Sequence, residues 1–213
     1  MRRRALLAST AALALSACAG TRPEEASPWR FFTPEEGATV TAICDRLIPP
    51  DALGPGGGQA GGAVFIDRQL AGPYGSSRDL YMRPPFLPGT PQQGGQSPLT
   101  PAARYRAGLA ALDAHCRAAF AGKSFADLSA ARQDDLLADL EAGRLTLGGQ
   151  GRAFFELVLR DTQDGFFADP RYGGNQGMAG WTLIGFPGAR YDYRDWVERH
   201  GEAYPHPPIT LLG

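Results

Sequence analysis

Few side chains in this sequence have the type and spacing that chemistry requires. Residues 56–61 match the G-x-G-x-x-G pattern of dinucleotide-binding folds, but in those folds the pattern leaves a strand and opens a helix. Here a helical pattern and Pro49-Pro50 precede it, so we interpret the segment as a flexible loop. The sequence also has no Gly-x-Ser-x-Gly elbow for a serine nucleophile. Neither dinucleotide binding nor serine hydrolysis is therefore expected.

The titratable residues give no acid–base or metal site. The three histidines are scattered, without the spacing of zinc ligands. Asp161, Asp164 and Asp169 follow one another at intervals of three and five residues across a helix end. Carboxylates so placed favour capping and solvated roles over an acid–base pair. We therefore predict no catalytic, cofactor-binding or metal-ligating residue in this chain, as is typical of an accessory protein.

The first residues indicate an export signal. Three arginines precede an apolar run from Ala5 to about Leu15 and a small-residue exit, which predicts a signal peptide over residues 1–17. Arg3-Arg4, with two leucines close behind, resembles the twin-arginine pattern, which addresses proteins exported already folded. The alternative is an ordinary secretory signal with an incidental arginine. Either route predicts a protein outside the cytoplasm, in the periplasm.

The exit of this signal carries a second pattern. Leu15-Ser16-Ala17-Cys18 resembles a bacterial lipobox, in which the cysteine is acylated and becomes the first residue. A multiply acylated Cys18 would hold the protein on the membrane surface, since each buried methylene contributes about 0.8 kcal/mol. The alternative is ordinary peptidase cleavage, which leaves no lipid. We expect a lipid anchor on Cys18, followed by a linker to residue 30.

Two cysteines remain after Cys18. Cys44 and Cys116 could pair with each other, pair with a partner chain, or remain buried small hydrophobic side chains. Two cysteines alone cannot hold an iron–sulfur cluster, and no Cys-x-x-Cys-His motif for covalent haem is present. We therefore treat Cys44–Cys116 as a candidate disulfide and expect no redox cofactor in this chain.

Composition and charge set further limits. The chain has 213 residues, with 21 basic and 22 acidic side chains, a size that suits one folded domain. The arginines do not cluster into a face that could follow phosphates, which argues against a nucleic-acid partner. No run of 18 or more apolar residues follows the N-terminus, so no membrane-spanning helix is expected in the body.

Helical periodicity dominates the body of the chain. Apolar residues recur at helical spacing in five segments, which lie between Thr33 and Pro49, Ala63 and Leu70, Thr100 and Gly122, Ser129 and Gly143, and Arg152 and Gln163. No strand pattern of useful length appears. The prediction is an all-α protein, a single irregular helical domain over residues 31–213 with long loops rich in glycine, proline and aromatic residues.

Two details of this pattern can be checked directly. In the second helix we expect Val64, Phe65 and Leu70 to face inward, and Asp67 and Arg68 to face outward. Residues 71–100 are rich in turn signals and predict a long surface excursion without regular structure. We expect its aromatic residues to pin it to the body; these are Tyr74, Tyr81 and Phe86.

Residues 165–188 combine glycines, prolines and aromatic rings. Such a composition predicts a fixed loop, since glycine permits close backbone approach and the rings supply burial. We expect this loop to bind a partner, and the alternative is a loop that only covers the core. The residues expected to contact the partner are Asp169, Pro170, Tyr172, Gly173, Gly174, Asn175, Trp181, Phe186, Pro187 and Gly188.

A family resemblance joins these segments. It rests on Phe31-Phe32-Thr33-Pro34-Glu35-Glu36, Ile43-Cys44-Asp45-Arg46-Leu47-Ile48-Pro49-Pro50, Phe65-Ile66-Asp67, Asp169-Pro170-x-Tyr172-Gly173-Gly174-Asn175, Gly180-Trp181 and Gly185-Phe186-Pro187-Gly188. With these motifs the chain resembles the gluconate 2-dehydrogenase subunit 3 family, the small subunit of membrane-bound flavin dehydrogenases. The resemblance covers nearly the whole chain after the signal.

The resemblance implies a non-catalytic partner of a large, FAD-dependent sugar or sugar-acid dehydrogenase of the GMC type. It places FAD, with an iron–sulfur cluster as a further option, in that partner and not in this chain. It also implies a cytochrome c subunit that passes electrons to quinone, and a twin-arginine signal on the small subunit that exports both chains through the twin-arginine machinery. The alternative function is a stand-alone periplasmic lipoprotein with a scaffolding or ligand-binding role.

Overall fold

The computed structural model describes residues 28–87, 89–93 and 97–212. The signal peptide, Arg3, Arg4, Cys18 and most of the linker lie outside these residues. Within the described ranges the structure has six α-helices and no strand, which confirms the all-α class. The helices are α1 (Pro34–Leu47), α2 (Gly62–Leu70), α3 (Pro101–Ala119), α4 (Ala130–Glu141), α5 (Gly151–Phe167) and α6 (Ala179–Ile184). None of them is both long and apolar enough to cross a membrane.

α1 begins where its capping signals predict. The Thr33 side chain accepts a hydrogen bond from the Glu36 amide, and the Glu36 carboxylate accepts one from the Thr33 amide. Pro34 occupies the first helical position, where a missing amide hydrogen leaves nothing unsatisfied. The helix ends at Leu47, just before Pro49-Pro50, as expected.

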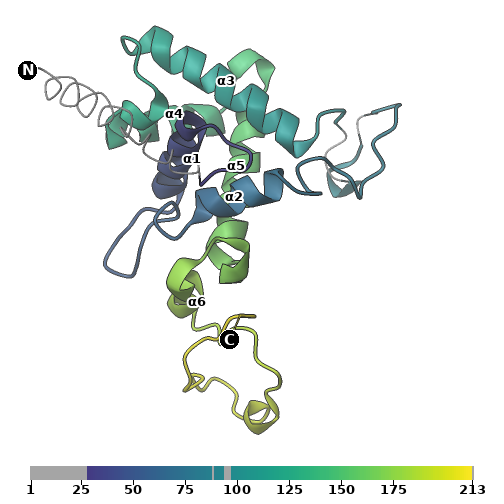
Figure 1. Cartoon of the computed structure of the whole chain (residues 1–213), viewed down its shortest axis with the longest axis vertical. Helices are drawn as coiled ribbons and strands as arrows, with labels where there is room; N and C mark the ends of the chain where they lie inside the picture. Colours follow the sequence, from purple (N-terminus) through teal and green to yellow (C-terminus); the bar gives the residue numbers. More distant parts are fainter. Residues whose placement is uncertain (1–27, 88, 94–96, 213) are drawn as a thin grey trace, which may run out of the picture.

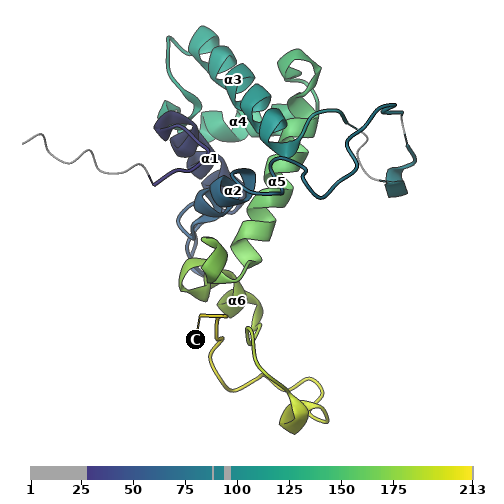
Figure 2. The ribbon, with the colours of Figure 1, turned by 45° about the vertical axis from the view of Figure 1, so that its right-hand side comes forward.

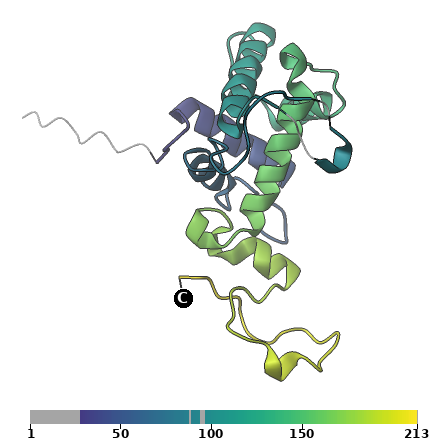
Figure 3. The same ribbon diagram turned by 90° about the vertical axis from the view of Figure 1, so that its right-hand side faces the viewer.

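α5 is the central helix of the body. It runs along the middle of the molecule and contacts α1, α2, α3, α4 and α6 (Figures 1 and 3). One apolar core lies around it, since a helix with several neighbours must be apolar over much of its surface. Core side chains that are almost fully buried include Val40, Ile43, Ile66, Tyr105, Leu112, Leu140 and Val158.

The expected outward position of Asp67 is wrong. Asp67 is fully buried, and its two carboxylate oxygens accept hydrogen bonds from the backbone amides of Arg30, Phe31 and Phe32 at 2.8 to 2.9 Å. The carboxylate therefore fastens the segment that enters α1 onto α2. Arg68, the next residue, is exposed as expected.

The described residues of segment 71–100 form the irregular excursion that the turn signals predict, and the one regular element among them is the short 3₁₀ turn Pro91–Gln93 (Figure 2). Tyr74 pins its start, because its hydroxyl donates to the buried Asp161 carboxylate at 2.9 Å. Phe86 is half-buried, but Tyr81 is 82% exposed, so its expected anchoring role is wrong. The excursion is thus held at its start and presents its middle to solvent.

Asp161 ties three elements together. Besides Tyr74, it accepts a hydrogen bond from Tyr105 on α3 at 3.0 Å and pairs with Arg160. Burial raises the pKa of the Asp161 carboxyl, and Arg160 and the two tyrosine hydroxyls oppose that shift. With every oxygen engaged inside the protein, Asp161 has a structural role.

The two cysteines of the body are both free thiols and both buried, which corrects the candidate Cys44–Cys116 disulfide. The structure corresponds to the alternative of two buried small side chains. The Cys44 sulfur lies 3.4 Å from the Thr162 hydroxyl on α5. Burial raises the pKa of Cys44 to about 12 and that of Cys116 to about 11. Each of the two side chains packs into the apolar core of the protein, as its place on the apolar stripe of its helix predicts.

Candidate partner-binding site

Residues 165–188 are more regular than the fixed loop that their composition predicts. α5 continues to Phe167, and two 3₁₀ turns, Pro170–Tyr172 and Gln176–Met178, lead into α6. The expected end near Gln163 of the helix predicted to begin at Arg152 is therefore too early. Gly165 lies in this extension and lets Phe65 of α2 pack directly against α5, since a Cβ there would lie 2.9 Å from that ring.

Two polar residues of the motif at 169–175, Asp169 and Asn175, make hydrogen bonds that hold the segment together. Asp169 accepts hydrogen bonds from the amides of Arg171 at 2.9 Å and Leu211 at 2.8 Å. Asn175, fully buried, donates to the Ala168 carbonyl at 2.9 Å and accepts from the Gly180 amide at 2.8 Å. These bonds fix α6 against the end of α5, and Pro170 begins the turn between them.

The glycines of the motif allow close backbone packing. Gly173 and Gly174 are both buried. A Cβ on Gly174 would lie 2.1 Å from the Gly165 carbonyl oxygen, and one on Gly180 would lie 2.2 Å from the Phe166 carbonyl oxygen. No side chain fits at such distances, so these positions bring the turns and α6 directly onto the backbone of α5.

The aromatic residues of the segment divide into buried and exposed groups. Trp181 is only 6% exposed, and its indole nitrogen donates to the Phe167 carbonyl at 2.7 Å. Tyr172 is 44% exposed, and Phe186 is exposed on one side while its ring packs against Trp181 at 5.2 Å. Pro187 is half-buried and Gly188 is buried beside Ile209. Of the ten residues expected to contact a partner, Tyr172 and Phe186 therefore offer large exposed apolar surface.

Exposed apolar side chains lie on α6 and beside it. α6 itself lies at the end of the body away from α3 and α4 (Figures 1 and 2). Leu183 lines a groove of about 60 Å³ between α6 and residues 48–55. We call this surface the α6 patch; it consists of Leu53, Phe167, Leu183, Ile184 and Phe186. Sequence reasoning found only Phe186 among these. The consecutive pair Leu183-Ile184 just before Gly185 was the available signal for the rest.

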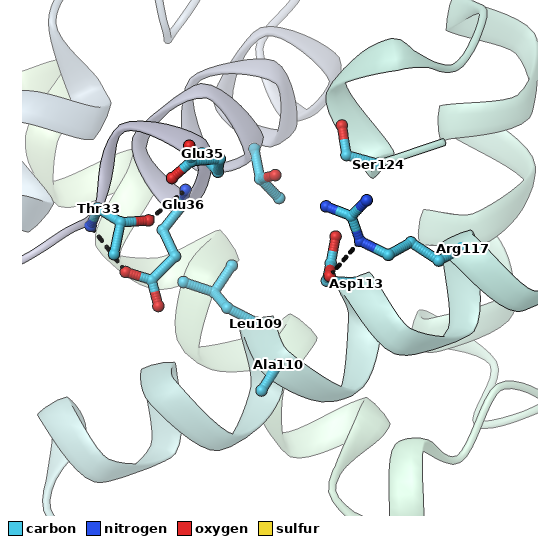
Figure 4. A pocket seen from close by; sticks show the side chains of 9 residues that line it. Thr33, Glu35, Glu36, Leu109, Ala110, Asp113, Arg117 and Ser124 are labelled. Carbon is cyan, nitrogen blue, oxygen red and sulfur yellow. Dashed lines mark hydrogen bonds and ion pairs between the residues drawn. The ribbon is translucent and has the colours of Figure 1, made fainter. Parts of the chain in front are cut away.

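A second groove, of about 210 Å³, lies between the start of α1 and the middle of α3 (Figure 4). Three of its charged side chains are already engaged, since Glu36 caps α1 and Arg117 pairs with Asp113 at 2.7 Å. Among the described residues, no group of three or more histidines, cysteines, aspartates or glutamates could hold a metal ion. This groove is therefore explained by helix capping and ion pairing, and the α6 patch is the better candidate site.

Comparison with known proteins adds the family. The family model described as Gluconate 2-dehydrogenase subunit 3 matches residues 34–188, from the first residue of α1 to the end of the segment that carries the α6 patch. Searches among curated proteins and among solved structures found no match. Because the match covers well over half of the chain, this protein belongs to the gluconate 2-dehydrogenase subunit 3 family, whose members are accessory subunits of a dehydrogenase complex.

Proposed function

We propose that this chain is the non-catalytic small subunit of a periplasmic, membrane-associated dehydrogenase for a sugar or sugar acid. Its partner is the FAD-bearing catalytic subunit of the GMC type, which it helps to fold and to export. Family membership implies partner subunits, and the exposed α6 patch is the single structural observation that supports a docking role for this chain.

The α6 patch has the properties of a docking surface. Contiguous apolar surface on a soluble chain usually marks an interaction site, and a few large anchors carry most of the binding energy. Ile184 is 60% exposed although it belongs to a helix whose other side is fixed by Asn175 and Trp181. Because the patch is already held in place, little conformational entropy is lost when a partner covers it.

Export explains why such a subunit carries its own signal. FAD is inserted in the cytoplasm, so the loaded catalytic subunit has to cross the membrane folded, and Arg3-Arg4 in this chain would direct both subunits to the twin-arginine machinery. A lipid on Cys18 would then hold the complex at the membrane, close to a cytochrome c subunit that accepts its electrons.

The export role is tested by replacing Arg3 and Arg4 with lysine together, with Arg2→Lys as the matched control. We expect the double variant to leave this chain and the flavoprotein subunit in the cytoplasm, while the control exports both. Cell fractionation with dehydrogenase activity as the readout distinguishes these results. Active flavoprotein in the periplasm of the double variant would contradict the export role.

The docking role is tested by Ile184→Asp. Leu80→Asp in the excursion is the matched control, since both substitutions replace an exposed apolar side chain. A charge in the middle of an apolar interface should weaken binding of the co-expressed flavoprotein at least tenfold, about 1.4 kcal/mol. The melting temperature of each variant should stay near that of the wild type. Equal affinities of the two variants would exclude the α6 patch as the interface.

A further inference from the structure

Residues 189–212 form an arm that projects from the end of α6, away from the helical body (Figures 1, 2 and 3). Its only regular element is the short 3₁₀ turn Arg194–Trp196. The family match stops at residue 188, so the arm lies outside the matched segment. The functions assigned to the α6 patch therefore leave the arm unexplained.

Both ends of the arm are fastened to the same place. At its start, the Ala189 amide donates to the Ile209 carbonyl at 2.8 Å, and the Ile209 amide donates to the Pro187 carbonyl at 3.3 Å. Near its end, the Leu211 amide donates to the buried Asp169 carboxylate at 2.8 Å. The arm is thus a closed loop, attached to the segment that holds α6.

An aromatic cluster gives the arm its shape. The Tyr204 ring lies at the centre, with the rings of Tyr193, Trp196 and His206 at 5.4 to 5.7 Å in edge-to-face contact. The Arg190 guanidinium lies over the Tyr204 ring at 4.9 Å. Such contacts stabilise a loop that has no other core, so a partner that binds it has less disorder to remove.

Some polar groups of the arm nevertheless lack hydrogen-bond partners, and some of its apolar side chains are uncovered. Trp196 Nε1 and Arg190 Nε are buried donors without an acceptor among the described residues, and such groups are rare in folded proteins. On the outside, Tyr191 is 98% exposed, and Val197 and Leu211 are also exposed. The arm therefore combines a preformed shape with uncovered apolar and polar groups.

We propose that the arm is a clamp that closes over the same subunit that covers the α6 patch. This inference rests on the proposed function, in which that subunit is the FAD-bearing one. The two surfaces adjoin, because the arm begins three residues after Phe186 of the α6 patch and the Leu211 amide at its other end bonds to Asp169, which precedes α6. The clamp thus extends an apolar protein interface beyond the segment that the family shares.

The charge of the arm favours a protein partner over an anionic membrane. Its three arginines stand against four acidic residues, and Arg194 pairs with Asp192 at 2.7 Å inside the arm. Peripheral membrane contacts need an excess of basic side chains at the lipid surface. A balanced, internally paired arm with exposed tyrosine and aliphatic side chains fits a protein surface instead.

Limited trypsin digestion of the mature chain, free and bound to its flavoprotein subunit, tests the clamp. The peptide bonds after Arg194 and Arg199 in the arm should be cut in the free chain and protected at least tenfold in the complex. The bond after Arg144, in the exposed turn between α4 and α5, is the internal control and should be cut at the same rate in both. Mass spectrometry identifies the cuts.

Tyr191→Ala, with Tyr81→Ala as the matched control, tests the clamp by affinity. Both tyrosines are almost fully exposed, so neither change should move the melting temperature. We expect Tyr191→Ala to raise the Kd for the flavoprotein subunit at least tenfold and Tyr81→Ala to leave it within twofold.

The outcomes separate this inference from the proposed function. If the wild-type chain forms no complex with the flavoprotein, the proposed function fails and the clamp fails with it. If the complex forms, but Tyr191→Ala binds within twofold of the wild type and the arm is cut equally in both states, only the clamp is wrong. If the free chain forms a dimer that protects the arm, a second copy is the occupant, which also overturns the clamp.

Discussion

Residues 165–186 and residues 189–212 are both rich in aromatic residues, yet the structure uses the two segments in opposite ways. In the first, the Trp181 ring is buried and its nitrogen donates to a carbonyl of α5. In the second, the Trp196 nitrogen is buried without an acceptor among the described residues, and the ring contacts Tyr204 and Arg199 of the arm. The first segment is part of the body, whereas the second is attached to it.

This contrast shows that aromatic composition does not reveal what the rings contact. Asn175 and Trp181 were expected at an interface by their type, but their side chains donate to backbone carbonyls at the end of α5. Segments that lack such neighbours keep their rings near the surface. Four predictions use this contrast, and they are ordered by the size of the expected effect on stability.

The largest effect is expected from Trp181→Ala, compared with Trp196→Ala. Removing a buried indole from the body should lower the free energy of unfolding by about 3 to 5 kcal/mol. The same change in the arm should cost less than about 1 kcal/mol in global stability, because a projecting segment opens locally without unfolding the body. Urea denaturation followed by far-UV circular dichroism measures both. Equal losses would remove the distinction between body and arm.

A matched pair of glycines tests the same contrast at the backbone. Gly174→Ala places a methyl group 2.1 Å from the Gly165 carbonyl oxygen and should cost about 3 kcal/mol, because backbone has to move. Gly201→Ala in the arm meets no atom within 4 Å, so only its positive φ of 76° opposes the change, at about 1 kcal/mol. Thermal unfolding of the two variants should rank them in this order, and the reverse order would contradict the close packing.

The body should also lose stability at high pH through Cys44. Burial raises the pKa of its thiol from the ordinary 9.0 to about 12, so below pH 9 the thiol is protonated in both states. Above pH 9 the unfolded chain releases this proton and the folded chain retains it, so stability falls as pH rises toward 12. The loss reaches about 1.4 kcal/mol at pH 10.

The difference between wild type and Cys44→Ala isolates this contribution from other groups. Their stability gap, measured by urea denaturation at pH 8 and pH 10, should shrink by that amount. A gap that does not change with pH would mean that the Cys44 thiol does not titrate in the unfolded chain, as in a disulfide.

Local signals allowed much of the helical body to be predicted. The start of α1 depends on Thr33, Pro34 and Glu36, which lie within four residues of one another, so the capping box is visible in the sequence. The role of Asp67 was not, because the amides that it accepts from lie 35 to 37 positions away. On helical spacing alone, an aspartate beside an arginine indicates a solvated face.

The sequence allowed the segment that carries the candidate site to be predicted, but not which of its side chains are exposed. The family motif directed attention to residues 169–188, and three of the five side chains of the α6 patch lie there: Leu183, Ile184 and Phe186. Whether Trp181 or Leu183 faces solvent depends on the rotation of α6, which Asn175 fixes through the Gly180 amide. That bond joins a turn to a helix start, and neither residue type alone predicts it.

The smallest effect on stability is expected from Tyr172→Ala. Tyr172 is 44% exposed and its ring contacts the Arg171 guanidinium at 5.4 Å, so its removal should change the free energy of unfolding by less than about 0.5 kcal/mol. If the motif segment binds the flavoprotein, Tyr172→Ala should weaken that binding strongly. Truncating an exposed aromatic anchor at an interface typically costs about 2 kcal/mol or more of binding free energy. Trp181→Ala supplies the comparison. It should lower the stability of the fold strongly, whereas its folded fraction should bind the flavoprotein with nearly unchanged affinity. Melting temperature and Kd measured on both variants decide the matter. A destabilised Tyr172→Ala would place that ring in the core, and an unchanged Kd would leave the α6 patch and the arm to carry the interface without it.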